Sequence, residues 1–395
     1  MHIAYIVSRF PHPSETFIVR ELDALDRTGD VEIELASLFP AVDLTVHPIA
    51  RRWMSRLMRP RSAGAALAVA RWAVTRPLRL LATIGVVVRG HWRNPRILVR
   101  ALATVPLAAQ LAGRWSRGEV SHIHAHYATY PALAAWICWR LTGTPYSFTA
   151  HAHDIYVDQG LLARKVRDAR FVVTISEFNR RFLADHGAEE GQVEVVHCGI
   201  DPAAYPFRAR QTADSGPVRV LCVASLQEYK GHRVLFDALA GAPELERLDL
   251  DLIGGGPLRA ELEALAAELG LSERIRFHGS APEERVRELL GRADLLVLPS
   301  IVAGDGQMEG LPVVLMEALA AGVCPVTTRL SGIPEIVADG VTGVLAEPGD
   351  SESLRAALAR ALAGGVFDAQ AGRSLVEREF DVHRSAERLR ALIAS

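Results

Sequence analysis

The stretch Glu309-Gly-Leu-Pro-Val-Val-Leu-Met-Glu317, which continues as Ala-Leu-Ala-Ala-Gly322, joins a glycine-containing loop to a short apolar helical pattern. Pro312 suits the first helical position, because its missing N–H would be unpaired there in any case, and Gly322 suits the residue just past the helix end. One carboxylate therefore precedes the predicted helix, and the other lies inside it.

The start of this helix predicts an anion site. Free N–H groups and the positive end of the helix dipole near residues 310–314 favour an anion such as a diphosphate. Ionised carboxylates only accept hydrogen bonds, so two of them suit a ligand with hydroxyl-rich groups on both sides of its phosphates, as in a nucleotide sugar. The alternative is a capped surface helix with two solvated glutamates.

Length and composition indicate a globular protein of two domains. A chain of 395 residues exceeds what one core usually supports, and 49% hydrophobic with 23% charged residues is typical of folded proteins. The cysteines are far apart and form no C-x-x-C pair, which favours a reducing cytosol and argues against disulfides or a zinc site. The chain begins directly with a strand pattern and shows no export signal.

The segment 44–118 differs from the rest in charge. It holds fourteen arginines, four of the six tryptophans and no Asp, Glu or Lys, so the remainder of the chain is acidic. Arg and Trp on apolar helices suit an anionic membrane surface, here the inner face of the plasma membrane. The run Leu80 to Val88 is too short to span a bilayer. A helical insertion with Arg on its wet face is the alternative.

Nucleic-acid binding would also explain an arginine cluster. However, the tryptophans are interleaved with aliphatic residues and no recognition motif accompanies them, so we expect no nucleic-acid partner.

Strand and helix patterns alternate through both halves of the chain, which predicts an α/β protein with two Rossmann-like, doubly wound sheets facing a cleft. Residues 202–217 break both periodicities and form the predicted linker. The expected domains are residues 1–205 and 217–375, with a C-terminal helix in 376–395 that packs back on the first domain.

Polar residues follow several predicted strands in the first half, where open α/β sheets bind ligands. The candidates in the first loop are Ser14 as helix cap, Glu15 and Thr16, and those at later strand ends are His126, His151, His153 and Asp154. For His151 a satisfied structural histidine is the alternative. The alternating histidines of 122–126 share one strand face, but no carboxylate or cysteine accompanies them, so we predict no metal site.

These loops together resemble glycosyltransferase family 4, a family of retaining transferases with the GT-B architecture, and most of all its exopolysaccharide, colanic-acid-type members. The matching pieces are Val7-Ser-Arg-Phe-Pro with Ser14-Glu-Thr-Phe-Ile18, Thr149-Ala-His151-Ala-His-Asp154, Ile175-Ser-Glu177, Cys198-Gly-Ile-Asp-Pro202, Tyr229-Lys-Gly-His232, Gly254-Gly-Gly-Pro257, Ala293 to Ser300, Glu309 to Glu317 and Ser331-Gly-Ile-Pro-Glu335. They cover nearly the whole chain, and the arginine-rich segment is the least typical part.

The resemblance implies a role for each matching residue. Glu309 would contact the donor sugar or diphosphate, Glu317 the ribose hydroxyls, Lys230 the leaving diphosphate, and His151 the donor sugar beside the reacting carbon. The remaining donor-binding candidates are Gly310, Leu311, Pro312, Gly255, Ser225 and Arg233. The family usually has Gly-Arg about five residues before the lysine, where this chain has Ala224-Ser225, and Arg233 is a candidate substitute for that charge.

The implied function is retaining transfer of a hexose from a UDP- or GDP-activated sugar to a lipid-linked or polysaccharide acceptor, in exopolysaccharide or glycoconjugate biosynthesis. No metal or other cofactor is expected. One alternative is a nucleotide-sugar epimerase on the same scaffold. Another is a non-catalytic, membrane-associated assembly partner, for which Ser225 is the only support.

Overall fold

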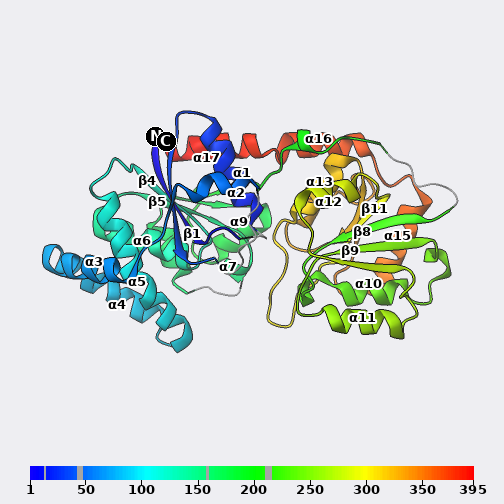
Figure 1. Ribbon diagram of the computed structural model, residues 1–395, viewed down its shortest axis with the longest axis horizontal. Helices are drawn as coiled ribbons and strands as arrows, with labels where there is room; N and C mark the ends of the chain where they lie inside the picture. Colours follow the sequence, from blue (N-terminus) through cyan, green and yellow to red (C-terminus); the bar gives the residue numbers. More distant parts are fainter. Residues whose placement is uncertain (13–14, 42–47, 157–159, 210–215) are drawn as a thin grey trace. The chain divides into compact units, whose positions relative to one another are not determined.

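The computed structural model describes residues 1–12, 15–41, 48–156, 160–209 and 216–395 (Figure 1). The predicted helix cap Ser14 lies outside the described residues. The chain forms two compact units, one of Met1–His197 with Ser385–Ser395 and one of Cys198–Arg384. Each unit contains a parallel sheet with helices packed on it, as the alternating strand and helix patterns predict.

The sheet of the first unit has its strands in the order β3-β2-β1-β4-β5-β6-β7, and all neighbouring pairs are parallel. Its strands are β1 (His2–Arg9), β2 (Glu32–Phe39), β3 (Leu57–Met58), β4 (His122–His126), β5 (Tyr146–Ala150), β6 (Phe171–Thr174) and β7 (Val193–Val195). The order reverses between β1 and β4, so this pair marks the switch point where such sheets bind ligands.

Helices of the first unit follow the strands and cover the sheet. They are α1 (Thr16–Arg27), α6 (Tyr130–Thr142), α7 (His153–Tyr156), α8 (Leu162–Asp168) and α9 (Glu177–Asp185). Strands β4, β5 and β6 are buried along their whole length, as expected for a parallel sheet covered on both faces. Trp136 of α6 and Phe148 of β5 are among the largest fully buried side chains.

The arginine-rich segment is helical, but three of its four tryptophans are core residues. Its helices are α2 (Pro48–Met54), α3 (Ser62–Thr75), α4 (Pro77–His91) and α5 (Pro95–Trp115). Trp53, Trp72 and Trp115 are buried, whereas Trp92 is 64% exposed. A position at the headgroup level is therefore ruled out for the three buried tryptophans and stays a prediction for Trp92. The spacing of residues does not tell which face of a helix another helix covers.

Among the described residues, α5 is the one helix that is long and apolar enough, by length and composition, to cross a membrane, and 44% of its apolar stretch is buried inside the protein. Its buried residues include Ala101, Ala108 and Ala112, and it packs against α3, α4 and α6. A core helix of a soluble protein can have the same length and composition, so this feature alone is weak evidence for a membrane span.

The sheet of the second unit has the order β10-β9-β8-β11-β12-β13, again with parallel pairs throughout. Its strands are β8 (Val218–Val223), β9 (Leu248–Ile253), β10 (Ile275–Gly279), β11 (Leu295–Leu298), β12 (Cys324–Thr328) and β13 (Val344–Ala346). The sequence pattern predicts a hairpin-like closing strand, which is wrong, because β13 pairs parallel to β12. The order reverses between β8 and β11.

The helices of the second unit complete its βα repeats. They are α10 (His232–Leu239), α11 (Arg259–Glu268), α12 (Glu283–Leu290), α13 (Val313–Ala321), α14 (Ile333–Ile336), α15 (Ser351–Ala363) and α16 (Ala369–Glu379), followed by α17 (Val382–Ala394). The part of α17 that belongs to the first unit carries Arg390, whose Nη1 lies 2.5 Å from Asp30 Oδ2.

Helix α13 is the helix predicted from the Glu309–Gly322 stretch. It begins one residue later than predicted, because Pro312 has an extended ψ of 114° and occupies the cap position before the first helical residue. Gly322 ends the helix in the left-handed conformation with φ of 76°, as predicted. Glu309 therefore precedes the helix and Glu317 lies within it.

Candidate functional site

The candidate residues of the second unit gather after β8 and β11, the two strands at its switch point. Lys230 lies in the loop after β8, and Glu309 lies between β11 and α13. The carboxyl ends of parallel strands meet at one edge of a sheet, which brings these two loops together.

Lys230 and Glu309 form a direct ion pair in which the ammonium donates to Glu309 Oε1. Both side chains are largely buried. Burial works to lower the pKa of Lys230, but the Glu309 carboxylate more than offsets it, so the pKa is raised. The ammonium also lies 4.8 Å from the centre of the Tyr229 ring. The site therefore holds a lysine that stays charged at neutral pH.

Glycine permits close backbone packing around this pair. Gly231 has a φ of +69°, and a Cβ at this position would lie 1.8 Å from the carbonyl oxygen of Pro299. A side chain is excluded at Gly254 for the same reason, because a Cβ added there would lie 1.8 Å from the carbonyl oxygen of Ala224. These contacts fix the loops after β8, β9 and β11 against one another.

The loop that carries Glu309 is held by a side chain from the loop after β12. Ser331 donates through Oγ to the carbonyl oxygen of Glu309 at 2.6 Å and to that of Gly310 at 3.1 Å. Gly310, Leu311 and Pro312 are buried, which places the start of α13 inside the unit. The backbone of these three donor-binding candidates is therefore held in a fixed position.

Glu317 is buried and accepts a hydrogen bond of 2.7 Å from the phenol of Tyr205. The guanidinium of Arg287 lies 5.4 Å from the centre of the Tyr205 ring. Sequence reasoning missed Tyr205, because it lies in the stretch read as a linker. A lone aromatic residue between two prolines was the only available signal.

The remaining donor-binding candidates occupy different surroundings. Ser225 and Gly255 follow β8 and β9, and a Cβ on Gly255 would lie 2.7 Å from Ser280 Oγ. Arg233 is exposed on α10 and pairs with the exposed Glu261 of α11. The proposed replacement of the missing arginine by Arg233 stays a prediction, and any such role has to compete with this ion pair.

The candidates of the first unit cluster at its own switch point. His126 ends β4, and His151 follows β5 directly. Nδ1 of His126 lies 3.1 Å from Nε2 of His151, and the two rings stack with their centres 5.4 Å apart. The rings of Phe17 and Tyr127 lie 4.9 and 4.7 Å from that of His151.

A carboxylate that the sequence did not reveal completes this cluster. Glu21 Oε1 lies 2.9 Å from Nε2 of His126 and accepts a second hydrogen bond, of 2.7 Å, from the phenol of Tyr5. Burial works to raise the pKa of Glu21, but His126 and the other neighbouring donors lower it to about 2. Burial, reinforced by His126, lowers the pKa of His151 to about 3. Glu21 is thus ionised and His151 neutral near pH 7.

Asp154 shapes the loop after β5. Its carboxylate accepts from the backbone N–H groups of Ala128 at 2.7 Å, Ala152 at 2.8 Å and His151 at 3.1 Å. Burial raises the pKa of Asp154, and these amides oppose the shift. The side chain joins the ends of β4 and β5, and the ligand contact that we predicted for it stays a prediction.

The other loop candidates of the first unit occupy different surroundings. Glu15 is the residue before α1, where its side chain makes no capping hydrogen bond, and Thr16 is the first residue of the helix. Burial raises the pKa of Glu15. His153 is exposed at the start of α7. The structure thus brings together His126, His151 and Glu21, and it places His153 facing solvent.

A metal site was not predicted, on the ground that no carboxylate accompanies the histidines of β4. That ground is wrong, because ligand atoms of Glu21, His124 and His126 lie within 4.8 Å of one another. The ring nitrogens that could bind a metal are nevertheless within hydrogen-bond distance of side chains of the protein. His124 Nδ1 and Nε2 lie 2.8 and 3.0 Å from the hydroxyls of Ser147 and Thr149, and His126 Nε2 contacts Glu21.

The acidic pair Asp249 and Asp251 also calls for comparison with a metal-binding Asp-x-Asp motif. Both residues lie inside β9, and Arg276 of β10 contacts them at 3.3 and 3.2 Å. His278 Nε2 lies 2.7 Å from Asp251 Oδ1. The pair is therefore part of a charged ladder between two strands and is not on a strand-end loop.

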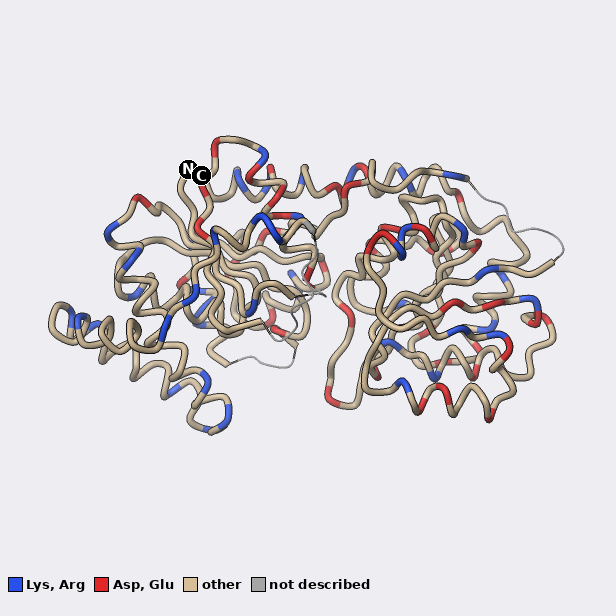
Figure 2. Tube along the Cα trace, in the orientation of Figure 1, with Lys and Arg blue, Asp and Glu red and all other residues tan. Residues whose placement is uncertain are grey.

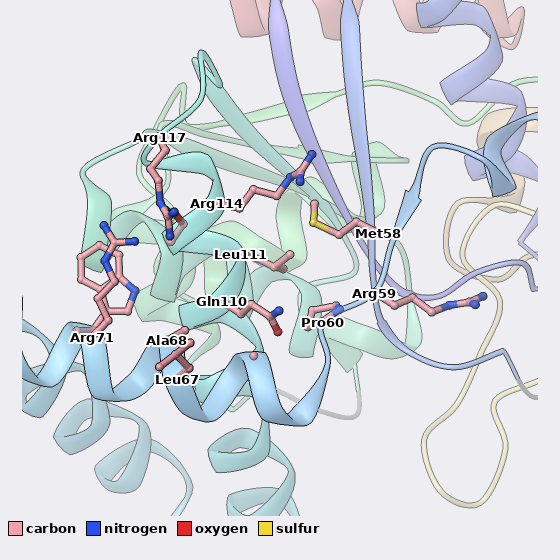
Figure 3. A pocket seen from close by; sticks show the side chains of 13 residues that line it. Met58, Arg59, Pro60, Leu67, Ala68, Arg71, Gln110, Leu111, Arg114 and Arg117 are labelled. Carbon is pink, nitrogen blue, oxygen red and sulfur yellow. Dashed lines mark hydrogen bonds between the residues drawn. The ribbon is translucent and has the colours of Figure 1, made fainter.

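A pocket of about 590 Å³ lies between α3 and α5 (Figure 3). Its walls combine apolar groups such as Leu67 and Ala68 with four arginines, Arg59, Arg71, Arg114 and Arg117. Arg114 pairs with Glu34 at 2.9 Å, whereas the guanidinium of Arg71 has no ion-pair partner among the described residues. The pocket is basic with an apolar wall.

Family models match the two halves of the chain in succession. Residues 34–204 match the model "Glycosyltransferase Family 4", and residues 206–374 match the model "Glycosyl transferases group 1". The boundary falls beside Tyr205.

Two of the similar proteins are named for the biosynthesis of amylovoran and of colanic acid. The amylovoran biosynthesis glycosyltransferase AmsK of Erwinia amylovora is 34% identical over 227 residues, which cover 56% of this chain and 55% of that protein. The putative colanic acid biosynthesis glycosyltransferase WcaL of Escherichia coli is 32% identical over 194 residues, covering 49% of this chain and 48% of that one. The chain thus spans about half the length of these relatives.

Among solved structures, HepE of Anabaena in complex with UDP and glucose matches with a TM-score of 0.72 at 17% identity, over 100% of this chain and 99% of that chain. This likeness shows a shared fold.

Proposed function

Because the chain belongs to glycosyltransferase family 4 and has the GT-B fold, we propose that it transfers a hexose, with retention of configuration, from a UDP- or GDP-activated sugar. The acceptor is a lipid-linked glycan or a polysaccharide in exopolysaccharide biosynthesis. The names of AmsK and WcaL support this assignment. The observation that carries it is the buried Lys230–Glu309 pair at the start of α13.

The proposed chemistry is electrostatic. Breaking the anomeric C–O bond builds negative charge on the leaving diphosphate and positive character on the sugar ring. Lys230 and the free N–H groups at the start of α13 stabilise the leaving group, and His151 contacts the sugar. The acceptor hydroxyl attacks from the face that the diphosphate leaves, and its proton passes to a phosphate oxygen. Glu309 orients Lys230, and Glu317 binds the ribose.

We also propose that the protein acts at the cytosolic face of the membrane, bound through the outer side of α3 and α4. Large apolar side chains are exposed here, including Val74 at 83% and Leu78 at 81%. The same helices carry arginines without any acidic residue, as Figure 2 shows. Each arginine near an anionic surface contributes roughly 1 kcal/mol, and the pocket between α3 and α5 adds further guanidinium groups.

The decisive experiment is a panel of sugar nucleotides tested for UDP or GDP release with a lipid-linked acceptor, with and without a chelator. We expect release from one donor, and the same rate in EDTA, because Lys230 and the α13 amides need no metal to bind diphosphate. Conversion of UDP-GlcNAc without acceptor would instead identify an epimerase. Calorimetric binding of a sugar nucleotide without turnover would identify a decayed site.

A further inference from the structure

Glu21, His126 and His151 form a continuous hydrogen-bonded chain inside the first unit. Oε1 of Glu21 lies 2.9 Å from Nε2 of His126, and Nδ1 of His126 lies 3.1 Å from Nε2 of His151. The chain links α1, the end of β4 and the residue after β5. Both imidazoles are buried.

The direction of these bonds is fixed from the carboxylate end. An ionised carboxylate only accepts, so Nε2 of His126 carries a hydrogen. With His126 neutral, its single hydrogen lies on Nε2 and its Nδ1 accepts, whereas a cationic His126 would donate from Nδ1 and give the opposite tautomer of His151. In the neutral form the hydrogen between the two rings belongs to Nε2 of His151, and Nδ1 of His151 is left with a lone pair.

Nδ1 of His151 has no hydrogen-bond partner among the described residues, although the side chain is buried. The ring cannot turn freely, since Phe17 and Tyr127 pack at 4.9 and 4.7 Å and His126 stacks on it. The main chain is held as well, because Asn179 donates to the carbonyl oxygen of His151. A lone pair in a fixed position is thereby kept available for a hydroxyl group.

We propose that Glu21 and His126 are positioning residues that fix the tautomer of His151, so that its Nδ1 accepts a hydrogen bond from a hydroxyl of the donor sugar. This rests on the proposed function for the identity of the ligand. The arrangement follows the logic of catalytic triads, in which a buried carboxylate holds an imidazole in one tautomer. The ligand class is a sugar with a hydroxyl near the reacting carbon, and a deoxy sugar at that position binds less well.

The test is a ¹⁵N NMR spectrum of histidine-labelled protein at neutral pH, which shows which ring nitrogens are protonated. The signals of His151 are assigned by their loss in the His151→Asn variant. We expect Nδ1 of His151 to be unprotonated in the native chain. Glu21→Gln places an amide beside His126, and its nitrogen can donate to Nε2 of His126. We expect this to shift part of the population to the opposite tautomer, in which Nδ1 of His151 is protonated. Tyr5→Phe removes the other donor to the same Glu21 oxygen and keeps the carboxylate. Its spectrum should keep the native pattern.

We also expect kcat of Glu21→Gln to fall roughly three- to tenfold, because one neutral hydrogen bond contributes about that factor. The KM for the acceptor should change little. A protonated Nδ1 in the native chain, or an unchanged His151 signal in Glu21→Gln, would overturn the inference. The spectrum needs no substrate. A native chain with the expected tautomer and no transferase activity would therefore refute the proposed function and leave the chain of hydrogen bonds standing.

Discussion

Lys230 and Glu309 are separated by 79 positions in the sequence, yet ammonium and carboxylate are in direct contact and largely shielded from water. Neither side chain can be changed alone without leaving a buried charge uncompensated, which is costly. The pair therefore links the stability of the second unit to the chemistry proposed for it.

The first prediction concerns this pair. Glu309→Gln keeps the shape of the side chain and removes its charge, so we expect transfer to fall by at least about a hundredfold, as for loss of a preorganised electrostatic contact. Circular dichroism should show an intact fold, with a lowered Tm. Glu263→Gln, which breaks the exposed Arg259–Glu263 pair, is the matched control and should retain native rates. Full activity of Glu309→Gln would contradict the assignment.

The second prediction separates backbone strain from steric overlap. Gly231 and Gly241 both have positive φ, of +69° and +59°, but a Cβ on Gly231 would lie 1.8 Å from Pro299 O, whereas one on Gly241 meets nothing within 4 Å. We expect Gly241→Ala to lower the free energy of unfolding by roughly 1–2 kcal/mol, the cost of the left-handed conformation. Gly231→Ala should cost clearly more. If denaturant titrations gave the same loss in the free energy of unfolding for both variants, the backbone at Pro299 would have to move aside at no cost, and the prediction would be wrong.

The third prediction concerns pH. Burial, together with Arg170, lowers the pKa of His122 from 6.5 to about 3. Between these values the unfolded chain binds a proton that the folded chain does not, so stability is lost as the pH falls from about 6.5 towards about 3. His122→Asn should make the fall in the free energy of unfolding shallower by up to about 1.4 kcal/mol per pH unit. Identical slopes for both proteins would disprove it.

The fourth prediction tests the membrane surface. Leu78 and Leu81 are 81% and 65% exposed on α4, and replacing both by Glu removes apolar area and adds negative charge. We expect sedimentation with phosphatidylglycerol vesicles to fall at least about tenfold, since each leucine is worth roughly 1.5–3 kcal/mol when buried. Native binding should weaken with salt and with neutral phosphatidylcholine.

The matched control for the membrane prediction lies in the other unit. Val302 and Val341 are 52% and 51% exposed, and replacing both by Glu likewise exchanges two exposed apolar side chains for carboxylates, in the unit that lacks the arginine-rich helices. This variant should bind vesicles like the native chain. Equal loss in both variants would point to a general charge effect and against a surface on α4.

Much of the second unit was predictable because its signals are local. The proline, glycine and glutamates of the 309–322 stretch set where α13 starts and ends, and the prediction missed its start by one residue. The family resemblance assigned Lys230 and Glu309 to one ligand, but their direct ion pair was not predicted, since no local pattern links residues so far apart. The roles of these residues remain predictions.

The first unit was harder to predict from the sequence, because tertiary packing decides which face of each helix is buried. Trp53, Trp72 and Trp115 were placed at a membrane surface and are in fact buried. Glu21 was overlooked, although it lies one turn from Ile18 and Leu25 on the face of α1 that packs inward. A carboxylate on the apolar face of an amphipathic helix is the signal that could have revealed it.

The division of the chain places Ser385–Ser395 in the same unit as Met1, with the whole of Cys198–Arg384 inserted between them. The second unit is therefore tethered at both ends, and a single proteolytic cut at one crossing leaves the other crossing intact. Deleting Ser385–Ser395 would remove part of the first unit, which contains His151, and with it Arg390, the ion-pair partner of Asp30. An affinity tag is better attached through a flexible spacer than in place of those residues.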